Sequence, residues 1–155
     1  MTGVVRHASS LVIGEMGVLI EGPSGSGKSS VMFGLVERAK LAGLDAAIIS
    51  DDQTILTPKE DGLWLSAPEQ IAGKAELRGF GIIDVQTAAG AWAKILGILV
   101  PAVNVERMPE PATSDLFGIK INVVKLPMNH EEAAARIVLA CLSAYQTQSL
   151  RFPSG

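Results

Sequence analysis

The stretch that decides the fold is Gly22-Pro23-Ser24-Gly25-Ser26-Gly27-Lys28-Ser29. It matches the phosphate-binding pattern G-x-x-x-x-G-K-[ST] at every fixed position, with an apolar strand pattern before it and a helical pattern after it. Glycines let backbone N–H groups turn toward phosphate oxygens, and the N-terminus of the following helix adds partial positive charge. We therefore predict that residues 22–30, including Ser30, bind the phosphates of a nucleotide, with Lys28 reaching the β- and γ-phosphates and Ser29 binding magnesium. The alternative is a flexible glycine turn that binds nothing, and the flanking elements argue against it.

The loop does not by itself select a reaction, because kinases, ATPases and GTPases all share it. The sequence N-K-x-D, which reads a guanine base in Ras-like GTPases, does not occur in the chain. We therefore predict ATP with Mg²⁺, rather than GTP, as the ligand.

The residues around the loop predict an α/β order of strand, loop, helix and strand. Residues 11–13 and 18–21 read as two short strands joined by a turn with glycines at both ends, which predicts a hairpin leading into the loop. Residues 29–41 carry apolar side chains at helical spacing, and Gly43 ends this helix. Residues 46–49 predict a buried strand of the parallel type.

Further along the chain the patterns are shorter. We predict strands and turns over 63–66 and 76–85, a short helical piece over 87–92, a buried strand over 95–105, an irregular surface loop over 101–114, and a strand over 119–126. The last predicted element is a helix over 131–144, with Asn129 as its cap and two glutamates in its first turn.

Composition limits the number of domains and the partners. The chain has 155 residues, 48% hydrophobic and 19% charged, which fits a single domain over residues 1–155. A net charge of −3 offers no cationic surface for DNA or RNA, so no nucleic-acid partner is expected. The apolar run 95–103 contains Pro101 and is far shorter than the roughly 20 residues that span a bilayer, so we expect a cytoplasmic protein without a membrane partner. The single cysteine, Cys141, is expected to be a buried, inert thiol.

Two adjacent carboxylates, Asp51 and Asp52, follow the predicted strand 46–49. In a parallel α/β arrangement they lie at the carboxyl end of that strand, the edge where ligands bind. One can hold magnesium while the other orients or deprotonates an acceptor hydroxyl, which is most of what phosphoryl transfer requires. The alternative is that the pair only solvates a strand end and opens a turn.

Three other polar residues are candidates from their positions. Glu76 and Arg78 precede glycines that permit a sharp bend, and Arg78 offers a partner for phosphate oxygens. The two side chains share one strand face, so they are equally consistent with a pair that neutralises itself. His7, ahead of the first hairpin strand, is consistent with a catalytic or a structural role.

The motifs together resemble the bacterial HPr serine kinase/phosphorylases. The resemblance rests on His7-Ala8, Gly17-Val18-Leu19-Ile20, Asp51-Asp52 and above all Glu76-Leu77-Arg78-Gly79-Phe80-Gly81-Ile82-Ile83-Asp84-Val85, which is similar to the family signature E-[ILV]-R-G-x-G-I-I-[DN]-V. It implies a P-loop kinase core of the HPr kinase / phosphoenolpyruvate carboxykinase type, a mixed sheet with flanking helices. It also implies the short form of the family, without an additional N-terminal domain.

The resemblance further implies an ATP-dependent protein serine kinase, and also a phosphorylase, acting on an HPr-like phosphocarrier of the bacterial phosphotransferase system. Asp51 would be the base toward the acceptor serine, with Asp52 beside it. Ser29 and Glu76 would hold Mg²⁺, and Arg78 and His7 would lie close to the transferring group. Family members are often hexamers, so a homo-oligomer is expected.

One segment departs from the family pattern. After the last strand, family members carry an arginine-bearing P-V-R-P-G-R-N-like segment, whereas this chain reads Leu126-Pro127-Met128-Asn129-His130. The departure motivates a second hypothesis, a regulatory module that binds nucleotide without turnover. A small-molecule kinase ranks last, because Arg107 is the one arginine in the long loop 101–114.

Overall fold

The computed structural model describes residues 2–147. Its strands are β1 (Val4–Arg6), β2 (Ala8–Ile13), β3 (Met16–Glu21), β4 (Ala46–Ser50), β5 (Thr54–Lys59), β6 (Gly62–Ser66), β7 (Lys74–Leu77), β8 (Gly81–Asp84), β9 (Ala91–Val100), β10 (Ala112–Leu116) and β11 (Ile119–Pro127). The helices in this range are α1 (Lys28–Leu41), α2 (Glu131–Thr147) and the short 3₁₀ helices η1 (Glu69–Ile71) and η2 (Ala102–Asn104).

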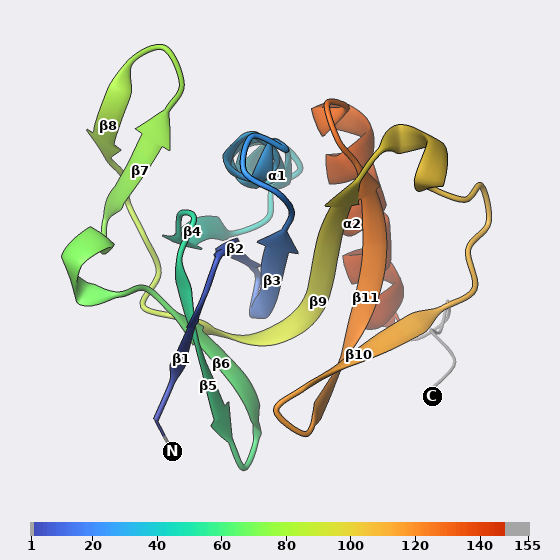
Figure 1. Cartoon of the computed structure of the whole chain (residues 1–155), viewed down its shortest axis with the longest axis horizontal. Coiled ribbons are helices and arrows are strands. Elements are labelled where there is room, and N and C mark those ends of the chain that lie inside the picture. Colours follow the sequence, from blue (N-terminus) through green and yellow to red (C-terminus); the bar gives the residue numbers. More distant parts are fainter. Residues whose placement is uncertain (1, 148–155) are drawn as a thin grey trace.

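Most strands form one mixed sheet in the order β1-β5-β6-β9-β3-β2-β4, and β11 with β10 attaches alongside the second half of β9 (Figure 1). The centre of the sheet is parallel, because β9 runs in the same direction as its neighbours β3 and β11. The carboxyl ends of these three strands meet at one edge, and the glycine-rich loop follows β3 there. The predicted mixed sheet with flanking helices is thus confirmed.

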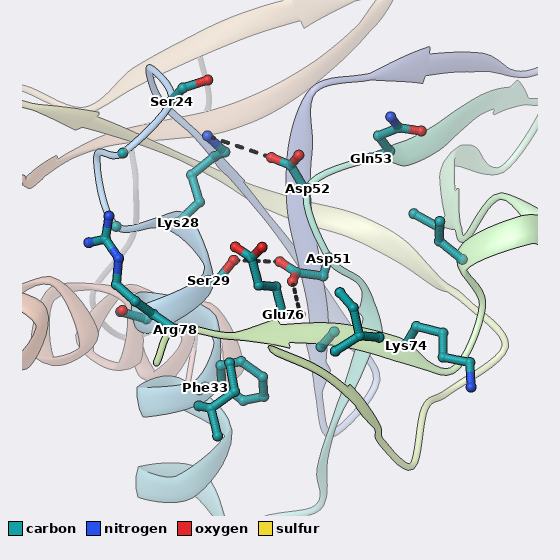
Figure 2. Close-up of a pocket in the computed structure, with 17 residues that line it drawn as sticks. Ser24, Lys28, Ser29, Phe33, Asp51, Asp52, Gln53, Lys74, Glu76 and Arg78 are labelled. Carbon is teal, nitrogen blue, oxygen red and sulfur yellow. Dashed lines mark hydrogen bonds and ion pairs between the residues drawn. The ribbon is translucent and has the colours of Figure 1, made fainter. Parts of the chain in front are cut away.

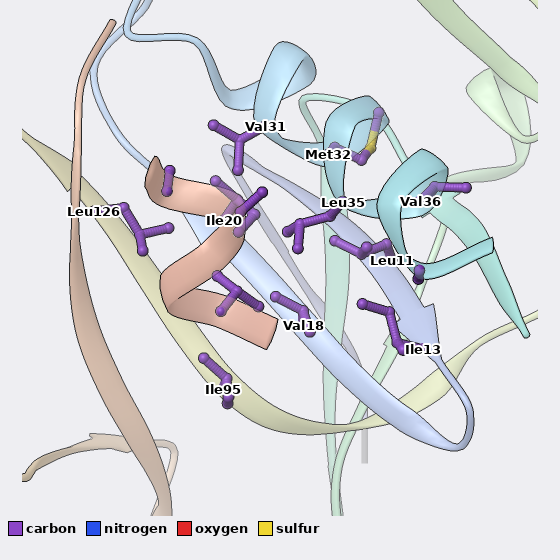
Figure 3. Close-up of a cluster of buried hydrophobic side chains, with 14 of the residues drawn as sticks. Leu11, Ile13, Val18, Ile20, Val31, Met32, Leu35, Val36, Ile95 and Leu126 are labelled. Atoms are coloured by element: carbon purple, nitrogen blue, oxygen red, sulfur yellow. The ribbon is translucent and has the colours of Figure 1, made fainter. Parts of the chain in front are cut away.

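Both α-helices cover the same face of the sheet, and the alternation of side chains along β3 explains how (Figure 3). Val18 and Ile20 are buried under α1 and α2, where they meet Leu35. Leu19 points to the opposite face, into a second buried cluster that includes residues of β5 and β6. Because β3 is buried on both faces, its sequence is a continuous apolar run rather than an alternating one.

The end of β4 is bent by a β-bulge. β2 pairs with β4 in antiparallel register, but Ser10 faces Ser50 while the next residue, Leu11, faces Ile48, so Ile49 is the extra residue. Such bulges turn the following side chains in a new direction and are common beside active sites. Here the bulge immediately precedes Asp51 and Asp52.

Strands β7 and β8 form a separate two-stranded hairpin that stands apart from the main sheet (Figure 1). Ala75 is buried, whereas Leu77, Phe80 and Ile82 are exposed. The hairpin contains most of the signature run that begins at Glu76.

Several predicted elements need correction. The helical piece over 87–92 is wrong: this segment is extended, the Ala88 N–H donates to the Ile48 carbonyl, and β9 begins at Ala91. Pairing with distant strands overrides the local pattern there. The predicted strand 95–105 ends at Val100, because Pro101 has no N–H to continue a ladder. The surface loop over 101–114 includes η2 and the first residues of β10.

Three finer predictions also change. Strand 46–49 pairs antiparallel with β2, and its one parallel contact is an isolated bridge between Ile48 and Thr87. The helix predicted over 131–144 extends to Thr147. Its cap position is His130, whose carbonyl accepts the Ala134 N–H, whereas Asn129 precedes the cap with a left-handed φ of 62°. Strands β1 and β5 were not predicted: β1 is an edge strand of three residues, and β5, which lies between β1 and β6, buries Thr54 and Pro58 beside Leu56 and so shows no apolar alternation.

Cys141 lies partly buried on α2, and burial raises the pKa of its thiol. We expect a thiol-specific disulfide reagent at pH 8 to react with the folded protein at least about tenfold more slowly than with the urea-unfolded chain. Because the folded state holds this proton more tightly, the free energy of unfolding should fall as the pH rises above about 9. An equal labelling rate in both states would contradict the prediction that this thiol is inert.

No helix within residues 2–147 is long and apolar enough to cross a lipid bilayer.

Candidate active site

The glycine-rich loop leaves β3 at Glu21 and enters α1 at Lys28. It is closed by a turn in which the Ser26 N–H donates to the Pro23 carbonyl at 3.0 Å. Gly25 and Gly27 adopt left-handed φ values of 80° and 101°, which side-chain-bearing residues rarely adopt. The backbone of this loop therefore favours glycine at position 27, which the pattern fixes, and at position 25, which it does not.

The first glycine is required for another reason. A Cβ atom on Gly22 would lie 2.6 Å from Ser26 Oγ and 2.9 Å from Leu99 Cβ, so the loop is packed tightly onto β9. Ser26 is 1% exposed, and its hydroxyl has no hydrogen-bond partner among the described residues. Gly22 and Ser26 thus shape the base of the loop and do not line its open side.

Lys28 is buried, with 5% of its surface exposed. Its Nζ donates to the carbonyls of Gly22 at 3.0 Å and Pro23 at 3.3 Å, and it lies 3.9 Å from Asp52 Oδ1. The ammonium group therefore sits over the start of the loop, facing the acidic pair (Figure 2). In this position the Lys28 ammonium group could also contact an anion bound by the loop.

Asp51 is 7% exposed, and three donors surround its carboxylate. Oδ1 accepts hydrogen bonds from Ser29 Oγ at 2.6 Å and Ser9 Oγ at 3.1 Å. Oδ2 accepts the backbone N–H of Glu76 at 3.0 Å. Asp51 thus connects three segments that are distant in sequence: β2, the loop at the start of α1, and the β7–β8 hairpin.

Asp52 is more open than its neighbour and has an unusual backbone. Its φ is 65°, a left-handed conformation that aspartate tolerates better than most residues. Oδ1 lies 2.6 Å from His7 Nε2 as well as 3.9 Å from Lys28 Nζ. Half of the Asp52 side chain remains exposed, so its carboxylate is available to a ligand between two basic groups.

These groups line a cavity of about 600 Å³ between the glycine-rich loop and the β7–β8 hairpin (Figure 2). Of the predicted site residues, the cavity is lined by Ser24, Gly25, Gly27, Lys28, Ser29, Ser30, Asp51, Asp52, Glu76 and Arg78. Gly22, Pro23, Ser26 and His7 do not line it: Gly22 and Ser26 belong to the base of the loop, Pro23 is exposed, and His7 contacts Asp52. The structure therefore brings the predicted residues of the loop, of the acidic pair and of the signature run together at one cavity.

Sequence reasoning missed part of the site. The remaining lining residues are Phe33, Gln53, Ile71, Lys74, Ala75, Leu77 and Ile82. Phe33 is one helical turn beyond Ser29, so helical spacing was a usable signal for it. Ser9, which donates to Asp51 from β2, was missed because it precedes the predicted strand 11–13 and belongs to no motif.

The donor set fits Mg²⁺ bound together with a nucleotide. Within residues 2–147 no group of three or more His, Cys, Asp or Glu side chains is arranged to hold a metal ion. Mg²⁺ is usually held by one or two protein oxygens together with phosphates and water, rather than by a complete protein cage. Ser29 Oγ, which donates to Asp51 Oδ1 at 2.6 Å, and the exposed carboxylate of Glu76 are oxygen ligands of that kind on one cavity.

Fold and site together define a class: mixed α/β proteins with a glycine-rich loop between a strand and a helix, and an acidic pair that follows another strand of the same sheet and lines the same cavity. The family model of the HPr Serine kinase C-terminal domain matches residues 2–154, and the chain belongs to this family.

Curated relatives and a solved structure agree with this assignment. An HPr kinase/phosphorylase of an Exiguobacterium species is 34% identical over 125 residues, covering 77% of this chain and 37% of the relative. One of Chloroherpeton thalassium is 31% identical over 134 residues, covering 79% and 38%. One of Streptococcus thermophilus is 28% identical over 158 residues, covering 94% and 49%. The chain thus spans less than half the length of these relatives.

The structure of the Hpr(Ser) kinase/phosphatase from Coxiella burnetii superposes with a TM-score of 0.77 at 24% identity, covering 94% of this chain and 97% of that one. This likeness confirms the fold.

Proposed function

We propose that the chain is an ATP-dependent protein serine kinase, with a reverse phosphorylase activity, acting on an HPr-like phosphocarrier of the bacterial phosphotransferase system. The observation that carries the proposal is the 2.6 Å hydrogen bond from Ser29 to Asp51, which places a carboxylate directly beside the phosphate loop. We infer HPr as the acceptor from the names of the relatives, HPr kinase/phosphorylase. We expect the reaction in the cytoplasm, where ATP is available, and a homo-oligomer, with a hexamer implied by family resemblance.

The roles follow from positions in the cavity. Backbone N–H groups of residues 22–29 and the Lys28 ammonium bind the triphosphate, while Arg78 faces the same cavity and pairs with phosphate oxygens. Ser29 and Glu76 would hold Mg²⁺, which neutralises charge on the phosphates when bound. Glu76 belongs to the hairpin and Ser29 to α1, so the metal ligands come from opposite walls of the cavity.

In the transfer step, the acceptor serine oxygen forms a bond to the γ-phosphorus, and the bond from that phosphorus to the bridging oxygen of ADP breaks. The serine proton passes to the Asp51 carboxylate, which acts as general base. Asp52, held beside it by His7 and Lys28, orients the acceptor. In the reverse direction inorganic phosphate first gives a proton to Asp51, and its oxygen then forms a bond to the phosphorus while the bond from that phosphorus to the serine oxygen breaks. Asp51 passes the proton to the serine oxygen, and pyrophosphate is released.

A second candidate function is a module that binds nucleotide and signals to a partner without turnover. It is favoured by the segment Met128-Asn129-His130 between β11 and α2, which contains no arginine. The Met128 N–H donates to the Val100 carbonyl, so this segment lies at the same sheet edge as the loop that follows β3. Nucleotide binding without transfer, and a partner whose affinity depends on nucleotide, would favour this function.

The test is transfer of label from γ-³²P-ATP with Mg²⁺ to purified HPr-like carriers of the same cell. We expect label on a serine of one carrier, and its removal when unlabelled inorganic phosphate replaces ATP. A carrier with that serine changed to alanine is the matched control. Nucleotide binding measured in the same preparation, with no label on any carrier, would refute the kinase and support the second candidate.

A further inference from the structure

Strand β2 contacts the acidic pair through a residue that does not line the cavity. Ser9, its second residue, is fully buried and does not line the cavity. Its hydroxyl contacts both members of the pair: Ser9 Oγ lies 3.1 Å from Asp51 Oδ1 and 3.0 Å from the backbone nitrogen of Asp52. One small side chain therefore links a carboxylate to the neighbouring peptide group.

The direction of the two hydrogen bonds is determined by chemistry. The carboxylate of Asp51 only accepts, so the single Ser9 hydrogen points to it. The backbone N–H of Asp52 only donates, so it uses a lone pair on the Ser9 oxygen. Alanine would remove both bonds at once, and the Asp52 N–H would lose the acceptor that Ser9 provides.

The second bond is important because of the backbone that it holds. Asp52 has a left-handed φ of 65° directly after the bulge in β4. Such a conformation persists only where surrounding contacts hold it. It directs the Asp52 carboxylate to His7 and Lys28 while Asp51 reaches Ser29.

We propose that Ser9 is a positioning residue for phosphate transfer: its hydroxyl aligns the Asp51 carboxylate with Ser29 and holds the Asp52 peptide in its left-handed conformation. The proposal rests on the proposed function, because it assigns Ser9 a part in the same reaction. Ser9 touches neither nucleotide nor acceptor, so it acts through Asp51 and Asp52 and not on the reacting atoms.

The adjacent residue supplies a matched control. Ser10 is also fully buried on β2, and its hydroxyl lies 2.8 Å from Thr54 Oγ1. Thr54 donates its own hydrogen to the Ala8 carbonyl, so Ser10 donates to Thr54. Ser10→Ala therefore removes a buried serine hydrogen bond from the same strand without touching either aspartate.

The experiment compares wild type, Ser9→Ala, Ser9→Thr and Ser10→Ala in steady-state transfer of labelled phosphate to the carrier. A small displacement of a catalytic group costs up to about 100-fold in rate, so kcat of Ser9→Ala should fall by about 10- to 100-fold. The KM for ATP should stay unchanged, because the phosphate loop is intact. Ser9→Thr, which keeps the hydroxyl, should recover most of kcat, and Ser10→Ala should match wild type.

A second measurement does not depend on turnover. Amide hydrogen exchange at Asp52, followed by NMR, should be faster in Ser9→Ala than in wild type and unchanged in Ser10→Ala. Equal kcat for the two alanine variants, or unchanged exchange at Asp52 in Ser9→Ala, would overturn the proposal.

If wild type transfers no phosphate, the proposed function fails, and exchange at Asp52 alone then decides whether Ser9 holds the pair. If Ser9→Ala does not fold, Ser9→Cys replaces it, because a thiol has similar size and forms only weak hydrogen bonds.

Discussion

Asp51→Asn is expected to lower kcat for phosphate transfer by about 10²- to 10⁴-fold, the range that a general base contributes. An amide oxygen has little affinity for the serine proton, so the base is lost while the phosphate loop remains. Nucleotide affinity, measured by calorimetry with Mg²⁺, should therefore stay close to that of wild type. Transfer at the normal rate would show that Asp51 is not the base.

The hydrogen bonds of Asp51 make a stability control necessary. Ser9, Ser29 and the Glu76 N–H all donate to this carboxylate, at both of its oxygens. Asparagine replaces one oxygen by an NH₂ donor, which would face at least one of these donors. Thermal unfolding should be recorded beside the rates, with Asp61→Asn, on the exposed turn between β5 and β6, as the matched variant. If Asp51→Asn loses phosphate transfer while most of the protein stays folded, the loss is due to the missing base and not to unfolding.

Lys28→Met should weaken ATP binding by roughly 100-fold or more, because hydrogen bonds to charged groups are worth about 1.5–3 kcal/mol each and each 1.4 kcal/mol is tenfold in affinity. Methionine keeps the apolar stem of a residue that is 5% exposed, so the change is mainly one of charge. The carbonyls of Gly22 and Pro23 also lose their ammonium donor, which loosens the start of the loop.

The measurement for Lys28→Met is ATP titration by calorimetry. Lys40→Met, in the last turn of the same helix and exposed, is the control for the loss of one positive charge. Unchanged affinity in Lys28→Met would mean that the cavity does not bind the phosphates through this loop. If Lys28→Met lost phosphate transfer but kept its affinity for ATP, Lys28 would act in the chemical step and not in binding.

The parts of the fold that sequence predicts are those specified by neighbouring residues. The loop pattern, the hairpin before it and α1 all depend on contacts within a few positions, and each lies within three residues of its predicted place. The pairing of β1 with β5 and that of β6 with the start of β9 join residues far apart in the chain, and local patterns do not encode those pairings. The error at 87–92 has this cause, since Ala88 bonds to Ile48.

The residues of the site also fall into those that the sequence predicts and those that it does not. Residues that belong to a motif, such as Lys28 and Asp51, were found, and they line one cavity. Ser9 was not, because its function depends on a bulge in another strand that brings Asp51 and Asp52 to it. The catalytic and metal-binding roles remain proposals that the variants above address.

The β7–β8 hairpin forms one wall of the cavity, and this wall differs from the other in local stability. One wall belongs to the main sheet and its buried clusters, while the other is a two-stranded unit in which Ala75 is buried and Phe80 and Ile82 are exposed. An isolated two-stranded hairpin is only marginally stable in water, so this wall unfolds locally at a far lower free energy than the sheet. The Asp51 bond to the Glu76 N–H is one of its few ties to the rest of the chain. We therefore expect the segment that carries Glu76 and Arg78 to unfold locally more easily than the main sheet, and a nucleotide that contacts both walls to stabilise its folded form.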